Sequence, residues 1–312
     1  MQKGFLAGLS PFAQLIMLAI IMLASYLFFM LIGILFSPFI MDIPMAELMN
    51  ILNSGGMSQN LNLMRYMQTL QGVGLFIIPA FFAAYLFSGN IVKYLYLRQS
   101  LETPMEKPAR WFGAVLLLMF AAMPCINLLA ALNEMIVFPQ SLSGLEQRLK
   151  AFEEAAQQMI KLFLEVDNVG GMFFNIFMIA MLPAIGEELI FRGLIQKNIA
   201  RWTRNIHVAI IITGFIFAAV HLQFYGLFPR WLLGVMFGYL LVWSGTMWLP
   251  VFAHFVNNAM AVFLSYLIHK EIIPEKIEIF GATKSDIPVT MVAAIICAWL
   301  LWKMYRIRVE GK

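Results

Sequence analysis

The chain has 312 residues, of which 62% are hydrophobic and only 12% are charged, and its formal net charge is +4. Soluble globular domains carry about 25% charged residues, so this composition excludes an ordinary soluble protein. Apolar runs of roughly 20 residues are long enough to cross a bilayer as helices. The alternating segments of about ten residues that are typical of membrane β-barrels are absent from the sequence. The fold class predicted is therefore all-α, a polytopic membrane helix bundle.

About eight transmembrane helices are predicted, one for each apolar segment of the chain. The segments cover residues 14–37, 70–88, 112–132, 172–196, 206–224, 230–245, 247–268 and 288–305. Gly234 and Gly238 in the sixth segment form a pair of small residues that permits close helix approach, either inside the bundle or at a dimer face.

One further helix is predicted between the third and fourth segments. From Leu145 to Phe163, apolar residues recur every three or four positions and charged residues fill the others. This spacing is typical of an amphipathic helix, and the stretch is too polar to span a membrane. We expect the helix to lie on the membrane surface or to cap the bundle.

Lys and Arg residues concentrate in every second connection between the apolar segments, as in residues 197–204 and 303–312. Because cytoplasmic loops carry an excess of Lys and Arg, both termini are expected in the cytoplasm, with an even number of spans between them. The positive charge thus follows membrane topology and gives no reason to expect nucleic-acid binding. We expect a multi-pass integral membrane protein, in the plasma membrane if its source is bacterial.

Two adjacent acidic residues, Glu187 and Glu188, lie inside the fourth apolar segment. Charge is costly in hydrocarbon, so intramembrane acids indicate a functional site. Residues four apart share a helix face, so Glu188 and Arg192 are expected to form an ion pair. Glu187 points to another face and has no cation beside it in the sequence. It is therefore the carboxylate expected to transfer a proton.

Two histidines and an asparagine in later segments complete a set that can hydrolyse a bond. Glu187 can accept a proton from a water molecule that His221 orients. His254 and Asn258 lie four residues apart on one helix face and can donate hydrogen bonds to a developing oxyanion. We expect convergence on one water-accessible cavity, with Glu187, His221, His254 and Asn258 as catalytic candidates and Glu188 and Arg192 as supporting residues.

Two other classes of protein remain open from the residues alone. A Glu/His/His set with water also suits catalytic zinc, although the sequence has no H-E-x-x-H motif. A zinc-dependent membrane metalloprotease is therefore an alternative, while our expectation is that no metal or other cofactor is needed. The second alternative is a non-catalytic membrane protein, such as an immunity factor or scaffold, that keeps the polar cluster for its structure.

Three motifs resemble those of the CAAX protease and bacteriocin-processing family, also called the Abi family. The segment Glu187–Arg192 matches the motif EExxxR, Phe217–His221 matches FxxxH, and His254–Asn258 matches HxxxN. The motifs occur in this order and in separate predicted spans. The resemblance covers roughly residues 170–265, and within the family the chain is similar to the type II CAAX prenyl endopeptidase.

This resemblance implies an intramembrane glutamic endopeptidase in which Glu187 and His221 activate water. His254 and Asn258 would form the oxyanion hole, and Glu188 with Arg192 would hold the site together. The implied partners are the lipid bilayer and a peptide or protein substrate, membrane-anchored ones included, but a prenylated substrate does not follow. Three regions are expected: residues 1–165 with N-terminal transmembrane helices and the amphipathic helix, 166–270 as the catalytic core of the family type, and 271–312 with an external loop and the last transmembrane helix.

Overall fold

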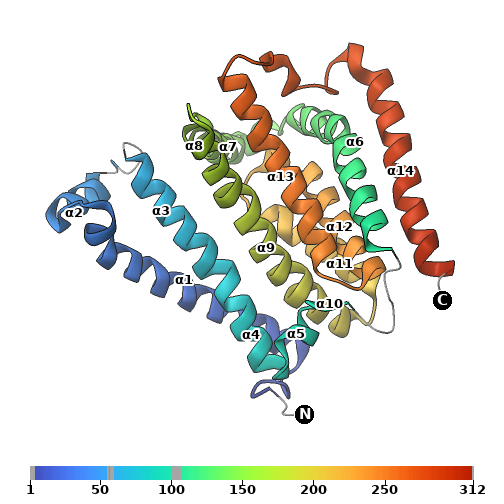
Figure 1. The fold of residues 1–312 in the computed structure, drawn as a ribbon, viewed down its shortest axis with the longest axis horizontal. Helices are drawn as coiled ribbons and strands as arrows, with labels where there is room; N and C mark the ends of the chain where they lie inside the picture. The colour runs from blue at the N-terminus through green and yellow to red at the C-terminus, as the bar shows by residue number, and fades with distance from the viewer. Residues whose placement is uncertain (1–3, 55, 57–59, 100–106, 311–312) are drawn as a thin grey trace.

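The computed structural model describes residues 4–54, 56, 60–99 and 107–310, and every regular element within these ranges is a helix. Residues 1–3 and residues 311–312, the end of the basic segment 303–312, lie outside these ranges. The long helices pack side by side into a bundle (Figure 1). This arrangement confirms the predicted all-α membrane fold.

Within the described ranges, seven helical stretches are long and apolar enough to cross a membrane. They are Pro11–Met41, Leu61–Ser88, Pro108–Glu134, Val169–Thr203, Phe224–Ser244, Trp248–His269 and Lys284–Val309. One shorter apolar helix, α11 (Ile206–Ala219), takes the place of the predicted fifth span. The expected set of about eight thus consists of seven long helices and a short one.

Helix α11 is shorter than the predicted span over residues 206–224. Its 14 residues rise about 21 Å, whereas a bilayer's hydrocarbon core is about 30 Å thick. The helix ends because Leu222 adopts a left-handed backbone conformation, with φ of 56°. A 3-10 turn, η6 (Phe224–Gly226), then leads into α12 (Leu227–Ser244), which packs along α11 as a hairpin.

The N-terminal half of the chain supplies one side of the bundle and the amphipathic helix. Its elements are α1 (Pro11–Met41), α2 (Met45–Ser54), α3 (Leu61–Gly72), the π-helical η2 (Val73–Ile77), α4 (Ile78–Ser88), α5 (Ile91–Tyr94), α6 (Pro108–Glu134), the 3-10 turn η3 (Gln140–Leu142) and α7 (Ser143–Leu164). Helix α7 is the predicted amphipathic helix.

The C-terminal half begins with one long, continuous helical stretch that changes its winding four times. It runs through α8 (Val169–Asn175), η4 (Ile176–Met181), α9 (Leu182–Glu188), η5 (Leu189–Ile195) and α10 (Gln196–Thr203), with η4 and η5 wound as π-helix. After the α11–α12 hairpin follow α13 (Trp248–His269), the 3-10 turns η7 (Glu275–Ile277) and η8 (Lys284–Asp286), and α14 (Ile287–Glu310).

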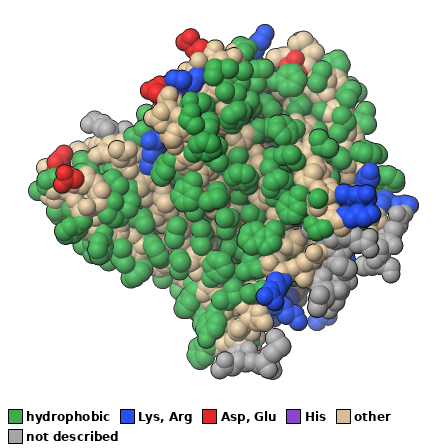
Figure 2. All heavy atoms as spheres, viewed as in Figure 1, with side chains coloured by type: hydrophobic (Ala, Val, Ile, Leu, Met, Phe, Trp, Pro, Cys, Tyr) green, Lys and Arg blue, Asp and Glu red, His purple; other side chains and the backbone are tan. Residues whose placement is uncertain are grey.

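The stretch α8–α10 and helix α13 lie in the middle of the bundle, with α1–α4 on one side and α6 and α14 on the other (Figure 1). Only 11% of the most apolar part of α1 is buried inside the protein, against 39% for Val169–Thr203. Hydrophobic side chains cover most of the visible face (Figure 2). Such a surface is suited to lipid, and the stretch that carries the two glutamates is the more deeply buried one.

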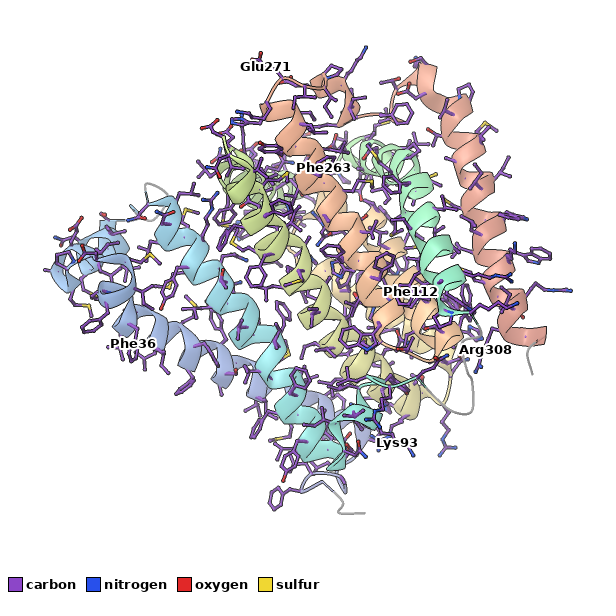
Figure 3. The ribbon with its side chains drawn as sticks, in the orientation of Figure 1. Phe36, Lys93, Phe112, Phe263, Glu271 and Arg308 are labelled. Carbon is purple, nitrogen blue, oxygen red and sulfur yellow. The ribbon has the colours of Figure 1, made fainter. Side chains whose placement is uncertain are left out.

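Charged side chains gather at the two ends of the bundle. The acidic side chains visible in Figure 2 lie in its upper and left parts, mixed with some basic ones, whereas only basic ones are visible at the lower right. Figure 3 places Glu271 at the upper end and Lys93 and Arg308 at the lower end. The asymmetry has the form that the positive-inside rule describes, with the basic end as the cytoplasmic one. The orientation itself stays a prediction.

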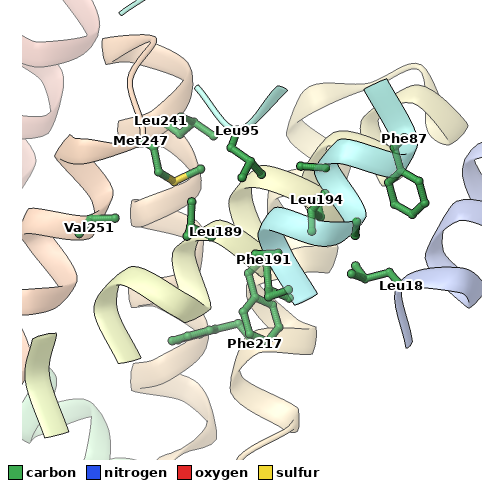
Figure 4. Packing of buried hydrophobic residues seen from close by; sticks show 14 of the residues in the cluster. Leu18, Phe87, Leu95, Leu189, Phe191, Leu194, Phe217, Leu241, Met247 and Val251 are labelled. Carbon is green, nitrogen blue, oxygen red and sulfur yellow. The ribbon is translucent and has the colours of Figure 1, made fainter. Parts of the chain in front are cut away.

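A buried apolar cluster joins the N-terminal helices to the central stretch. Leu18 of α1 and Phe87 of α4 pack into the same core as Phe191 and Leu194 of η5 and Phe217 of α11 (Figure 4). The rings of Phe191 and Phe217 meet edge to face, with centroids 5.3 Å apart. This core supports the turn of helix directly after the two glutamates.

The two glycines of α12 serve packing inside the bundle rather than a dimer face. A Cβ atom on Gly234 would lie 2.9 Å from the Cα of Gly214 in α11. A Cβ on Gly238 would lie 2.9 Å from the side chain of Ile210. A real Cβ atom cannot come this close to its neighbours. Helices α11 and α12 can therefore approach each other backbone to backbone only because residues 234 and 238 are glycines.

We predict that Gly234→Ala destabilises the protein, because the methyl group would meet immovable backbone; overpacking of this kind costs ~1–3 kcal/mol. The measurement is the melting temperature in detergent. Gly113→Ala on α6 is the matched control, since a Cβ there meets nothing within 4 Å. Equal melting temperatures for the two variants would contradict the close approach of α11 and α12.

Candidate active site

The two glutamates lie at the end of α9, between the π-helical segments η4 and η5. Single π-helical turns inside α-helices occur frequently at functional sites. The side chain of Glu187 is 13% exposed and that of Glu188 is fully buried. Neighbours in sequence therefore have different environments, as the helix geometry predicted, and Glu187 is the one within reach of water.

The predicted ion pair between Glu188 and Arg192 is confirmed. Nε of Arg192 lies 3.0 Å from Oε2 of Glu188, and both side chains are completely buried. The guanidinium group also donates a hydrogen bond of 3.0 Å to the carbonyl oxygen of Gly234 in α12. Three aromatic rings lie around it, with centroids 4.5 Å (Phe217), 5.4 Å (Phe237) and 5.9 Å (Phe191) from its central carbon. A carboxylate, a backbone carbonyl and aromatic rings thus surround Arg192, and all of them favour a cation, although its Nε and Nη1 have no hydrogen-bond partner among the described residues.

His254 of α13 connects the two glutamates, a contact that the sequence spacing did not predict. Its Nδ1 lies 2.9 Å from Oε1 of Glu188, and its Nε2 lies 4.0 Å from Oε2 of Glu187. Since a carboxylate only accepts hydrogen bonds, Nδ1 is the protonated nitrogen. The ring stacks on Phe237 at an interplanar angle of 17° and a centroid distance of 5.2 Å. Its orientation toward Glu187 is fixed by these contacts.

His221 follows directly after the end of α11, where the last carbonyl groups of the helix lack intrahelical partners. Its Nδ1 donates a hydrogen bond of 2.8 Å to one of them, the carbonyl oxygen of Phe217. This bond assigns the proton to Nδ1 and leaves Nε2 as a hydrogen-bond acceptor. Because α11 ends early, His221 lies just beyond its last turn, with Nε2 free to accept a hydrogen bond.

Asn258 contacts the helix of the glutamates at the point where a proline interrupts it. Pro183 has no N–H with which to satisfy the carbonyl of Ile179 four residues earlier. Asn258 Nδ2 donates a hydrogen bond of 3.2 Å to that carbonyl. Oδ1 of Asn258 accepts a bond of 3.1 Å from Nδ2 of the neighbouring Asn257. One N–H of the Asn258 amide is left for a ligand.

All four catalytic candidates line one cavity of about 390 Å³: Glu187, His221, His254 and Asn258. The predicted convergence of these side chains is therefore what the structure shows. The rest of the lining is mainly apolar and includes Ile179, Pro183, Leu233 and Val262. Glu188 and Arg192 do not line the cavity. Glu188 instead contacts the lining residue His254 from its buried side, as expected of a supporting residue.

A polar network at the mouth of the cavity was missed by the sequence analysis. Arg230 of α12 donates a bond of 2.7 Å to Oε1 of Gln223, and both residues line the cavity. Gln223 in turn donates 3.1 Å to Oε1 of Glu153 in α7, whose Oε2 accepts from the N–H of Tyr225 at 3.3 Å. No sequence motif marks these residues, because they meet only when α7 folds back onto the η6 turn.

Helix α7 therefore caps the bundle. Beyond the Glu153 contacts, its apolar residues Ile160 and Leu164 line the cavity directly. Of the two predicted positions, on the membrane surface or over the bundle, the structure supports the second.

Metal binding is not decided by this geometry. Among the residues that the structure describes, His, Cys, Asp and Glu side chains form no group of three or more that could hold a metal ion. The expectation that no metal is needed stays a prediction.

Comparison with known proteins bears on the same part of the chain. Residues 169–260 match the family described as "Type II CAAX prenyl endopeptidase Rce1-like". This segment is Rce1-like. It starts with the first residue of α8 and includes all three motifs, so the predicted resemblance is confirmed over these residues.

A curated protein with the same kind of likeness is the "Uncharacterized protein YpbD" of Bacillus subtilis (strain 168), 31% identical over 93 residues. The alignment covers 28% of this chain and 43% of YpbD, so the chain spans less than half the length of that relative. No solved structure matches.

We predict that Arg192→Ala destabilises the fold, because it leaves Glu188 buried without its cation; breaking such a pair costs about 3–5 kcal/mol. Membrane yield and melting temperature measure the effect. Lys161→Ala is the matched control, since Lys161 and Glu165 have the same spacing but are 77% and 47% exposed, and exposed pairs contribute little. A stable, well-expressed but inactive Arg192→Ala protein would instead indicate a direct catalytic role for Arg192.

Proposed function

We propose that the protein is an intramembrane endopeptidase that hydrolyses a peptide bond with water activated by Glu187. The observation that carries the proposal is the shared cavity, in which a partly exposed carboxylate faces two histidines and an amide. The Rce1-like segment supports the same class of activity, since it contains every one of these residues.

In the proposed reaction, Glu187 takes a proton from a water molecule while the water oxygen attacks the carbonyl carbon of the substrate. Nε2 of His221 is free to accept the second hydrogen of that water and so fixes its direction, because Nδ1 is already bonded to Phe217. When the C–N bond breaks, Glu187 returns its proton to the leaving nitrogen. The carboxylate is thereby regenerated, and no covalent enzyme intermediate is needed.

The negative charge that develops on the carbonyl oxygen would be stabilised by His254 and Asn258. Asn258 retains one amide hydrogen after its bond to Ile179. His254 is held in place by the bond from Nδ1 to Glu188. It would donate to the oxyanion from Nε2, which requires the imidazolium form with a proton on both ring nitrogens, and a preorganised donor of this kind stabilises a transition state without having to reorient. The buried ion pair acts in this scheme through position only.

The cavity also suggests what the substrate presents. Its mainly apolar walls suit an extended segment with apolar side chains, such as a membrane-anchored peptide or protein. Arg230 and Gln223 are polar groups at one side of the lining, where α7 closes over the cavity. The proposal includes no requirement for a prenyl group.

The central prediction concerns Glu187→Gln, which keeps the shape of the side chain but cannot accept a proton. Turnover of a cleaved peptide should fall by about 10² or more, with an unchanged melting temperature. Cleavage is followed by mass spectrometry on a peptide library, which also gives the cleavage site. Glu154→Gln, at an exposed position on α7, is the control and should cleave normally. Near-normal cleavage by Glu187→Gln would contradict the mechanism in which Glu187 activates the water. A wild-type protein that cleaves nothing would favour the non-catalytic alternative.

The metal-free mechanism predicts that chelators leave cleavage unchanged. The base, the water ligand and the oxyanion donors are all supplied by protein side chains in this scheme. The measurement is activity before and after dialysis against a chelator, together with the metal content of the active protein. Stoichiometric zinc, with activity lost on chelation and restored by zinc, would establish the metalloprotease alternative.

The capping helix gives a prediction on access. Glu153→Ala removes the bonds from α7 to Gln223 and Tyr225, so α7 should open more readily and KM should change by several-fold with kcat little altered. Glu154→Ala, the next residue on the exposed side of α7, is the matched control. A loss of kcat alone would show that Glu153 affects the chemical step and that α7 does not govern access.

A further inference from the structure

A second cavity of about 710 Å³ lies among the ends of the helices at the basic end of the bundle. It is separate from the active-site cavity and shares no lining residue with it. Its polar lining includes Gln14, Tyr94, Tyr96, Lys197, Arg201 and Arg308. Arg192 also borders it, so this cavity and the active-site cavity flank the same buried ion pair.

Three basic side chains face this cavity without a counter-ion among the side chains that the structure describes. No Asp or Glu whose side chain the structure describes lies within ion-pair distance of Lys197, Arg201 or Arg308. Burial raises the pKa of the Tyr94 and Tyr96 phenols, so they stay neutral and add no negative charge. The lining is thus positively charged, in contrast to the active-site cavity.

The basic groups are held in place by neutral partners. Nζ of Lys197 donates to the carbonyl oxygen of Tyr94 and lies 3.9 Å and 4.2 Å from the ring centroids of Tyr94 and Tyr96. Arg201 donates 2.8 Å to Oε1 of Gln14. These contacts fix the cations without neutralising them. Lys197 is partly buried, and charge taken out of water without a counter-charge is costly, whereas Arg201 is exposed. An anion in the cavity would supply the missing partner.

We propose that this cavity binds a phosphate-bearing anion, and that its source is the head group of an anionic phospholipid. The position favours a lipid over a free ion, because the cavity lies at the end of the bundle with Lys93 and Arg308 (Figure 3), where the positive-inside rule places the cytoplasmic leaflet. That leaflet carries anionic lipids, and basic pockets between transmembrane helices on this side bind their phosphates. The inference does not depend on the proposed protease activity.

The experiment compares lipids on the purified full-length protein in a neutral detergent. Equilibrium binding and the melting temperature are measured with short-chain phosphatidylglycerol and with phosphatidylcholine of the same chain length. Wild-type protein should bind the anionic lipid at least about tenfold more tightly, since basic side chains near lipid contribute about fivefold each. Inorganic phosphate is then added as a competitor. If inorganic phosphate displaces the lipid, the site recognises the phosphate group alone. If phosphate does not displace the lipid, the site recognises the lipid head group.

The decisive variant is the double substitution Lys197→Gln with Arg201→Gln, which should weaken phosphatidylglycerol binding about 25-fold. Lys93→Gln removes an exposed charge at the same end, outside the cavity, and should leave binding unchanged. If the double variant cannot be purified, Arg308→Gln should lose about fivefold. Equal affinity for the two lipids, or wild-type affinity in the purified variants, would overturn the proposal.

Discussion

The buried ion pair between Glu188 and Arg192 is the interaction on which the polar centre of this protein depends. Each partner has a second bond that reaches another helix: Glu188 accepts from His254 of α13, and Arg192 donates to the carbonyl of Gly234 in α12. The pair thus ties three helices together at one point inside the membrane. Removing either charge would leave the other without compensation in a dry interior, which is why we expect this centre to fold as a unit.

Adjacent glutamates can perform different tasks because successive helix residues point in different directions. Glu188 turns toward the cation and is fully buried, whereas Glu187 turns toward the cavity and keeps 13% of its side chain exposed. His254 lies between them, with one ring nitrogen on each. In our proposal this separates support from chemistry: one carboxylate orients the histidine, and the other handles the proton.

Sequence spacing predicted those features that arise within one helix. The Glu188–Arg192 pair, the shared face of His254 and Asn258, and the amphipathic α7 all follow from a period of 3.6 residues. The sequence analysis did not predict contacts between helices, because local spacing does not determine the angle at which two helices cross or the rotation of each helix about its axis. The bond from His254 to Glu188, the contact of Asn258 with the carbonyl freed by Pro183, and the docking of Glu153 on Gln223 belong to this class. The early end of α11 was missed because apolar residues continue beyond Ala219, while the left-handed Leu222 ends the helix.

The most direct test of the central ion pair is a double-mutant cycle. The unfolding free energies of wild type, Glu188→Gln, Arg192→Met and the double variant would be measured by denaturant titration in mixed micelles. Each single variant leaves a bare charge and the double variant leaves none, so the account predicts that the double variant loses less than the sum of the single losses, by about 2 kcal/mol or more. Additive losses would contradict it, because they would show that the two charges do not depend on each other.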